Sequence, residues 1–274
     1  MTANAAAHPP APLSAFDARG IVGVLTDIDD TLTTDGRLTP DAYSALCSLA
    51  RAGIRVVPVT GRSAGWAHMV AKTWPVAAVV AESGGLYLYV DPTDGRLHQR
   101  MHASAERVNA DRARLRACAQ RVMAAVPGLA PASDNAYRLV DLALDYCEEL
   151  PRVPPAEVER AMKMFRDAGF SARASSVHVN AWAGVFDKAP TALACLAERF
   201  GDAGPEAIAR WAFIGDAPND ASMFAAFPNS VGVANILPHL ASLPRPPAYV
   251  TRGASGEGFV EFARHLLAAR AAVG

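Results

Sequence analysis

Short apolar runs rich in β-branched residues recur along this chain and alternate with helical patterns, which limits the fold more than any other feature. Continuous apolarity is typical of parallel strands covered on both faces. One connecting segment carries complete helix signals, with Thr39 as N-cap, Pro40 at the first helical position and Gly53 beyond the end. Such alternation predicts a doubly wound parallel sheet. The predicted strands are 21–26, 54–59, 76–81, 211–214, 230–233 and 248–250.

The middle of the chain has a different pattern. A helical stretch at 104–126 precedes an alternating segment at 137–147, and a second helical stretch at 154–168 precedes another at 171–182. Two helices with antiparallel-type strands predict a separate α+β module inserted into the sheet domain. The predicted parts are a disordered tail (1–20), a Rossmann-like core (21–89 and 185–274) and an inserted α+β cap (90–184).

Charge and composition exclude several classes of protein. The formal net charge is -1, which favours neither nucleic acid nor an anionic membrane as a partner. No apolar run approaches the roughly 20 residues of a membrane span, and the start lacks a signal-peptide pattern. The four cysteines are far apart, which predicts neither a zinc site nor disulfides. We therefore expect a cytoplasmic protein; the oligomeric state stays open.

Polar clusters directly follow three of the predicted strands. In open α/β sheets, ligands bind beyond the carboxyl ends of the strands, so these clusters should converge. Taken singly, each is weak, because a Thr-Gly pair is often a plain turn and Asp220 could simply favour a helix dipole. The clusters are Asp27-Ile28-Asp29-Asp30-Thr31, Thr60-Gly61-Arg62 and Gly215-Asp216-Ala217-Pro218-Asn219-Asp220.

The carboxylates in these clusters predict a metal site. Asp27, Asp29, Asp216 and Asp220 would lie close together, and adjacent like charges raise each other's pKa unless a cation intervenes. An all-oxygen ligand set without His or Cys favours Mg²⁺. An EF-hand is excluded because its glycine and glutamate positions are occupied by leucine.

These motifs, together with Lys188 at the start of a later helix, resemble the four motifs of haloacid dehalogenase superfamily phosphatases in order and spacing. The resemblance extends over residues 23–264. The long insertion lies between the second motif and Lys188, which resembles the cap of subfamily IIB, as in Cof-type and sucrose-phosphatase-like enzymes.

The resemblance implies a magnesium-dependent phosphatase that acts on a small phosphorylated metabolite, with a sugar phosphate as first choice and a cofactor-like phosphate as second. Asp27 would be the nucleophile, and Asp29 would protonate the leaving alcohol and then deprotonate water. Thr60 would bind a phosphoryl oxygen, and Lys188 would neutralise charge on the transferred group.

The same resemblance gives roles to the remaining motif residues. Mg²⁺ would be held by the Asp27 carboxylate, the Asp29 backbone carbonyl and Asp216, with Asp220 directly or through water. Asn219 would orient this loop or Lys188, and Gly61 and Arg62 would complete the phosphate and substrate site. The sequence departs from the family pattern at Asp30 and Ala189, where glycine is usual, and at 82–85, where Cof-type relatives often have Asn-Gly.

Two polar faces in the cap leave alternatives open. His178 and Asn180 share one face of a predicted strand, and we hypothesise that this face closes over the active site; ordinary cap packing is the alternative. Asp141 and Asp145 share a face of the other strand, which could lie near a sugar hydroxyl or be solvated.

Other functions remain possible on the same scaffold. A phosphomutase or phosphotransferase would use the same groups but deliver the phosphoryl unit to a sugar. A non-catalytic metabolite-binding protein is the alternative from a different class. Dehalogenation is disfavoured, because it needs neither an acidic metal cluster nor a proton donor.

Overall fold

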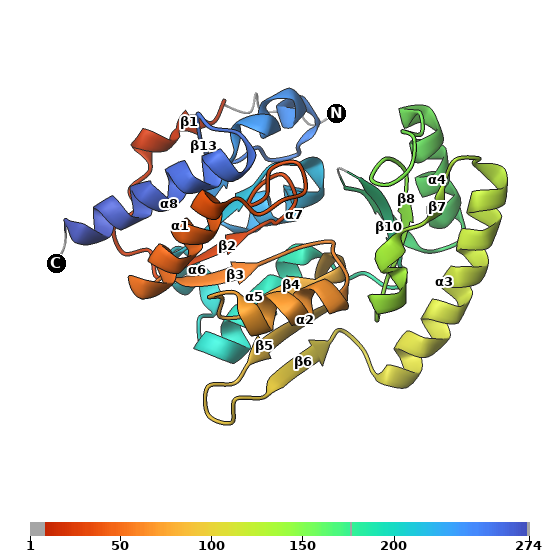
Figure 1. The fold of residues 1–274 in the computed structure, drawn as a ribbon, viewed down its shortest axis with the longest axis horizontal. Helices are drawn as coiled ribbons and strands as arrows, with labels where there is room; N and C mark the ends of the chain where they lie inside the picture. The colour runs from red at the N-terminus through yellow and green to blue at the C-terminus, as the bar shows by residue number, and fades with distance from the viewer. Residues whose placement is uncertain (1–8, 176, 273–274) are drawn as a thin grey trace. The chain divides into compact units, whose positions relative to one another are not determined.

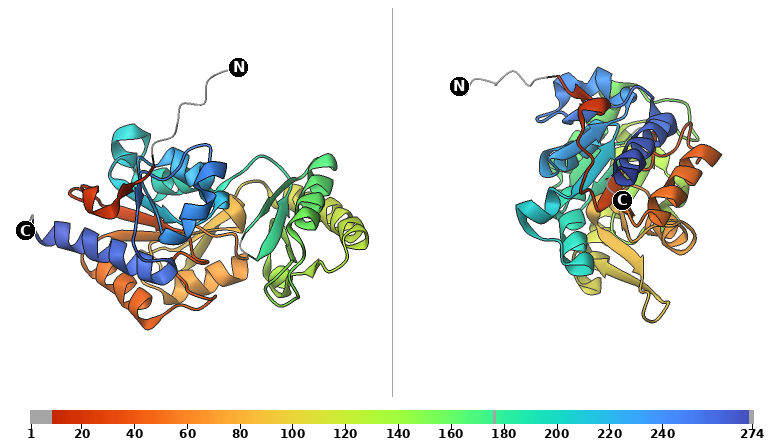
Figure 2. Two further views of the ribbon diagram at one scale, coloured as in Figure 1. Left: turned by 90° about the horizontal axis from the view of Figure 1, so that it is seen from above. Right: turned by 90° about the vertical axis from the view of Figure 1, so that its left-hand side faces the viewer.

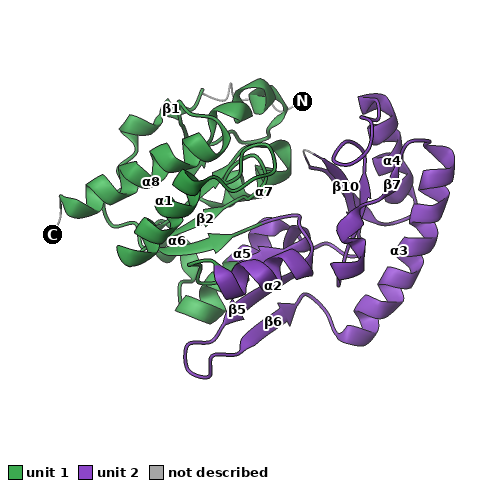
Figure 3. Ribbon diagram, viewed as in Figure 1, with its two compact units in different colours: residues 1–59, 74–78, 193–274 green, residues 60–73, 79–192 purple. Residues whose placement is uncertain are grey.

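The structure is a computed structural model that describes residues 9–175 and 177–272. The chain forms two compact units (Figure 3). Unit 1 contains residues up to 59, 74–78 and from 193 onward, and unit 2 contains 60–73 and 79–192. The predicted cap at 90–184 lies within unit 2, whose bounds are wider, so the proposed domain limits remain a prediction.

Unit 1 is built on a six-stranded sheet in which every pairing is parallel (Figure 1). The predicted parallel core is therefore confirmed, except for the predicted strand at 76–81. That segment contains β4 (Val79–Ala81), which lies in a different sheet and pairs antiparallel with β5 (Leu86–Val90). In spatial order the strands of the six-stranded sheet are β1 (Ala11–Pro12), β13 (Tyr249–Val250), β12 (Asn229–Gly232), β11 (Trp211–Gly215), β2 (Gly23–Thr26) and β3 (Arg55–Pro58).

Helices cover both faces of this sheet. α1 (Pro40–Arg51) and α8 (Ser255–Ala271) pack side by side on one face, as Figure 2 shows. The N-cap prediction for α1 is confirmed, because Thr39 Oγ1 accepts a hydrogen bond from the Ala42 amide at 3.3 Å. On the other face, the Phe213 ring of β11 contacts Phe224 of α7 (Ala221–Ala226). Alternate β11 side chains thus enter two different cores.

The predicted disordered tail is wrong for residues 9–20. β1 extends the sheet by pairing with β13, and Leu13 in the following 3-10 turn η1 (Leu13–Ala15) is buried. The Phe16 ring lies 5.0 Å from that of Tyr249. These apolar side chains cover the sheet edge, which offsets the entropy cost of ordering the segment. Residues 1–8 lie outside the described part.

Unit 2 contains two antiparallel sheets. The smaller one consists of β4 (Val79–Ala81), β5 (Leu86–Val90) and β6 (Leu97–Met101), and α2 (Ala64–Thr73) packs on it. The larger one has the order β7 (Ala130–Pro131), β8 (Leu142–Asp145), β10 (His178–Trp182) and β9 (Ser171–Ala174). Two helices, α3 (Ala105–Ala125) and α4 (Pro155–Asp167), cover one face of it. This confirms the predicted α+β character of the insertion.

Two strand predictions in this unit need correction. The segment 137–147 contains strand only at β8, because the chain before it forms the 3-10 turn η3 (Ser133–Tyr137). The segment 171–182 is two antiparallel strands, not one. The Ser175 hydroxyl, just after β9, accepts a hydrogen bond at 3.0 Å from the amide of His178, the first residue of β10. Polar–apolar alternation is present on both sides of this boundary, but its phase changes at the two consecutive serines, Ser175 and Ser176, which mark the end of one strand pattern and the start of the next.

The remaining helices are short or join the two units. α5 (Lys188–Phe200) begins in unit 2 and ends in unit 1, and α6 (Gly204–Ile208) belongs to unit 1. Among the described helices, none is long and apolar enough to cross a membrane.

Candidate active site

Three aspartates converge in unit 1. Asp27 directly follows β2 and Asp216 directly follows β11, and these two strands are neighbours in the parallel sheet. Asp220 lies at the end of the 3-10 turn η4 (Pro218–Asp220). All three are buried, and one carboxylate oxygen of each lies within 4.8 Å of the others. The predicted convergence of the first and last motifs is therefore present in the structure.

Neighbouring donors fix the orientation of these carboxylates. Asp216 Oδ1 accepts a hydrogen bond from the Thr31 hydroxyl, and its Oδ2 accepts one from Asn235 Nδ2, both at 3.2 Å. Asp220 Oδ2 accepts the Asp216 amide at 3.2 Å. A side chain at Gly215 would lie 2.4 Å from that same oxygen, so only glycine fits. Asn235, which the sequence analysis gave no role, belongs to this group.

This acidic group fits a hard divalent cation. Three buried carboxylates at such separation repel one another, and burial makes that repulsion costly without a positive charge between them. Their donor atoms are all oxygen, which matches the preference of Mg²⁺. The residues present thus fit the predicted Mg²⁺ site.

Asp29 and Asn219 lie close to these acids in sequence. Asp29 is half-buried, and its carboxylate is not in the three-aspartate group. That its backbone carbonyl contributes to the metal site stays a prediction. Asn219 lies within η4, and its buried Oδ1 has no hydrogen-bond partner among the described residues. Asp30 has φ of 56°, a left-handed conformation that glycine adopts most readily.

The second motif forms a tight turn in unit 2. Thr60 is fully buried, and its Oγ1 accepts a hydrogen bond from the Arg62 amide at 3.0 Å. Because the oxygen acts as the acceptor, the hydroxyl retains its single proton for donation. The Thr60 amide donates to Val80 O at 2.9 Å, which ties the turn to β4.

Lys188 begins α5 and is 2% exposed. Its backbone is held against the turn that follows β4. Gly84 has φ of 99°, and a side chain there would lie 2.2 Å from the Asp187 carbonyl oxygen. Thr191 Oγ1 also donates to Gly84 O at 2.6 Å. The 82–85 segment therefore sets the backbone position of Lys188, which is a role that the sequence analysis did not foresee.

Gly84→Ala should displace Lys188 and lower kcat/KM by about 10-fold or more, because small displacements of a catalytic group are costly. The measurement is steady-state phosphatase kinetics on the folded variant. Gly95→Ala is the matched control, since Gly95 also has positive φ (69°) but a side chain there would meet no atom within 4 Å. Equal losses in both variants would contradict a specific role for the Gly84 contact.

Arg62 is held by an acidic partner from the cap region. Its guanidinium contacts Glu148 Oε1 at 2.8 Å, and His178 Nε2 lies 2.7 Å from Glu148 Oε2. The contact from His178, together with Arg62, lowers the pKa of Glu148 to about 2. Glu148 therefore stays ionised and draws together two of the predicted substrate-binding residues. No sequence pattern pointed to Glu148, because it lies in a polar stretch after β8 that resembles an exposed loop.

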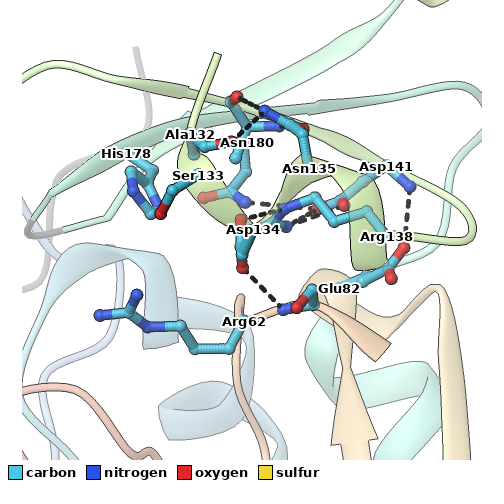
Figure 4. A network of polar contacts seen from close by, with 12 residues as sticks. Arg62, Glu82, Ala132, Ser133, Asp134, Asn135, Arg138, Asp141, His178 and Asn180 are labelled. Atoms are coloured by element: carbon cyan, nitrogen blue, oxygen red, sulfur yellow. Dashed lines mark hydrogen bonds and ion pairs between the residues drawn. The ribbon is translucent and has the colours of Figure 1, made fainter. Parts of the chain in front are cut away.

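Asn180 takes part in a buried polar network within unit 2 (Figure 4). Its Nδ2 lies 3.3 Å from both Gly61 O and Asp141 Oδ2. Asp141 is also paired with Arg138, and Asp145 accepts three backbone amides in the turn after β8. Neither aspartate is on a solvated face, which corrects one of the two alternatives. Burial raises the pKa of Asp141 to about 7, although Arg138 opposes the shift.

Glu82 is a further buried acid that the sequence analysis did not single out. It is 0% exposed, and its φ of 50° is left-handed. Oε1 accepts the amides of Ala64 and Leu139, each at 2.8 Å. Oε2 accepts the amides of Val140 and Asp141, at 2.6 and 3.0 Å. This carboxylate joins the start of α2 to the segment that leads into β8.

No family model matches the chain. A curated phosphoglycolate phosphatase from Pyrobaculum neutrophilum is 32% identical over 243 residues, covering 87% of this chain and 92% of the relative.

Solved structures share the fold at lower identity. A Thermoplasma acidophilum protein matches with TM-score 0.69 at 20% identity, covering 90% of this chain and 98% of its own. The C-terminal domain of C. albicans trehalose-6-phosphate phosphatase has TM-score 0.69 at 15% identity, with 96% and 99% covered. The sucrose-phosphatase of Synechocystis sp. PCC6803 has TM-score 0.61 at 17% identity, with 90% and 98% covered.

The chain belongs to the haloacid dehalogenase superfamily, as its motifs predicted, and within that superfamily it is a phosphatase. The parallel core and the inserted α+β module are consistent with subfamily IIB.

Proposed function

We propose that this protein is a Mg²⁺-dependent phosphomonoesterase that works through an aspartyl-phosphate on Asp27. The observation that carries the proposal is the buried group of Asp27, Asp216 and Asp220 at the ends of adjacent parallel strands. A phosphatase of this superfamily needs both a nucleophile and charge neutralisation at one place, and this group offers both.

The chemistry divides into two displacements. An Asp27 carboxylate oxygen attacks phosphorus, the bond from phosphorus to the ester oxygen breaks, and Asp29 gives its proton to the leaving alkoxide. Asp29 then takes a proton from a water molecule that attacks phosphorus, and the bond to Asp27 breaks to release phosphate. This alternation requires one ionised and one protonated carboxyl group at the outset.

The other proposed roles concern charge and orientation. The Thr60 hydroxyl donates to a phosphoryl oxygen, and the Lys188 ammonium offsets its negative charge. Gly61 and Arg62 complete that turn, and Asn219 orients the loop that carries Asp220. Mg²⁺, held by Asp27, Asp216, Asp220 and the Asp29 carbonyl, would neutralise charge on the phosphoryl group when bound.

For the substrate we propose a sugar phosphate, with phosphoglycolate as second candidate. The sucrose-phosphatase neighbour was solved with sucrose and phosphate, which supports the first, and the 32% identical relative supports the second. His178, paired with Glu148, is the cap residue that we propose contacts the substrate beyond its phosphate. Asn180 is engaged by Gly61 and Asp141, so its direct substrate contact is less favoured than the sequence suggested.

Phosphate release should be measured from sugar phosphates, phosphoglycolate and an activated aryl phosphate. We expect release that is restored by Mg²⁺ after EDTA treatment. Release that survives exhaustive chelation would contradict the metal-dependent mechanism. Transfer to an added sugar without free phosphate would indicate a phosphotransferase, and inactivity with tight ligand binding would indicate a non-catalytic protein.

Asp220→Asn should raise the Mg²⁺ concentration for half-maximal activity by about 10-fold or more, because one charged oxygen ligand is lost. A Mg²⁺ titration of phosphate release measures this. The exposed Asp41→Asn is the matched control and should leave the titration unchanged. An unchanged Mg²⁺ requirement in Asp220→Asn would remove Asp220 from the proposed ligand set.

A further inference from the structure

The turn that carries Thr60 is held by hydrogen bonds from a segment that is distant in sequence. Asp134, Arg138 and Asn180 make three direct hydrogen bonds to this turn, two to Gly61 O and one from the Ser63 amide. Glu82 adds an indirect link, because its carboxylate accepts the Ala64 amide and the amides of residues 139–141, and all of these residues belong to unit 2. In Figure 4 the side chains of Asp134, Arg138, Asp141 and Asn180 converge above this turn.

Arg138 is the central residue of this hydrogen-bond network. Its side chain is 0% exposed, and its Nε and Nη2 donate to the two Asp134 oxygens at 3.0 Å each. Nη1 donates to both Asp141 oxygens, at 2.9 and 3.0 Å, and to Gly61 O at 3.0 Å. Asp134 Oδ2 in turn accepts the Ser63 amide at 3.3 Å. One guanidinium thus links two carboxylates to the backbone of the turn.

These contacts determine where one amide hydrogen points. In a planar trans peptide, the carbonyl oxygen and the following amide hydrogen point in opposite directions. Arg138 and Asn180 hold Gly61 O from the cap side, so the Arg62 N–H must point the other way. That amide donates to Thr60 Oγ1 at 3.0 Å. The orientation of the Gly61 peptide therefore determines the orientation of the Thr60 hydroxyl group.

We infer that Arg138 and Asn180 are positioning residues for phosphoryl transfer: they fix the Gly61 peptide so that the Thr60 hydroxyl is aimed at the phosphoryl group. The inference rests on the proposed function of Thr60. The inserted cap segment thereby completes the phosphate-binding turn, in addition to any contact it makes with substrate.

The chemistry of the cluster supports a positioning role over a purely stabilising one. Buried ion pairs are costly to desolvate, and an apolar cluster of similar volume is often equally stable. An apolar cluster, however, makes no directional contacts that could orient the Gly61 peptide. The planar guanidinium offers five donors in a fixed arrangement, whereas a lysine ammonium could not serve Asp134, Asp141 and Gly61 O with the same geometry.

Kinetics of Arg138→Lys and Asn180→Ala test the inference, with Asn135→Ala as matched control. Asn135 is a neighbouring asparagine whose side chain bonds Ala132 and Ala143 but not the turn. We expect kcat/KM to fall about 10- to 100-fold in Arg138→Lys and less in Asn180→Ala. The inhibition constant of inorganic phosphate should rise in both, while Asn135→Ala keeps wild-type values for each.

Hydrogen exchange provides a readout that does not depend on activity. The amides of residues 61–66 should exchange at least tenfold faster in Arg138→Lys and Asn180→Ala than in wild type or Asn135→Ala. If wild type releases no phosphate, the proposed function fails, but the exchange result still tests whether Arg138 and Asn180 hold the turn at 61–66 in place. Should Arg138→Lys not fold, Asn180→Ala carries both measurements.

Two results would overturn the inference. One is an unchanged kcat/KM and phosphate inhibition constant in the folded Arg138→Lys and Asn180→Ala variants of an active enzyme. The other is an equal loss in Asn135→Ala, which would show that general packing of the cap, not the Gly61 contact, governs activity.

Discussion

Asp27→Asn is expected to abolish phosphate release, with kcat lowered by at least about 1,000-fold, the scale seen when a covalent nucleophile is removed. Asn has nearly the same shape as Asp but cannot form the phosphorylated intermediate. It also removes one charge from the acidic group that includes Asp216 and Asp220. Single-turnover assays with a trapped or isotopically labelled phosphoryl group would show whether label reaches the protein in wild type and not in the variant.

The control for this variant is Asp35→Asn, an exposed aspartate on the following turn with left-handed φ, which Asn tolerates well. It should retain wild-type kinetics. Residual activity of Asp27→Asn within tenfold of wild type, after deamidation is excluded by mass spectrometry, would mean that Asp27 is not the nucleophile.

Glu82→Gln is expected to lower the free energy of unfolding by about 2–4 kcal/mol, a large effect for a nearly isosteric change. The wild-type carboxylate accepts two backbone amides on each oxygen. In the variant, one oxygen becomes an NH₂ group that faces two donors and can accept neither. Two buried amides then lose their partner, and unpaired buried donors are costly.

Chemical denaturation followed by circular dichroism would measure the change. Glu159→Gln on α4 is the matched control, because its side chain is 61% exposed and should alter stability by less than about 0.5 kcal/mol. A Glu82→Gln protein as stable as wild type would show that water or local rearrangement satisfies the four amides. The same variant should also show faster exchange at the Ala64 amide, since that amide is a direct donor.

The sequence by itself determined the parallel core, the inserted α+β module and the acidic motifs. Apolar strands flanked by helical patterns have few other ways to bury both faces, so the sheet followed from local signals. The convergence of Asp27 with Asp216 followed from the rule that ligands gather at the carboxyl ends of neighbouring parallel strands. The motif order also sufficed to predict the superfamily, because each motif is a short contiguous segment.

Only the tertiary structure decided which polar residues of unit 2 meet. Arg138, Asp134 and Glu82 are ordinary charged residues in sequence, and nothing local shows that they are buried. Asp134 and Asp141 do lie at helical spacing from Arg138, which offered a weak hint, but the hydrogen bond from Arg138 to Gly61 O spans 77 residues. Nothing local in the sequence indicates the hydrogen bond between Asn235 and Asp216 or the close contact of Gly84 with the Asp187 backbone either. Such contacts are long-range, and their strength depends on exclusion from water, which a linear pattern does not encode.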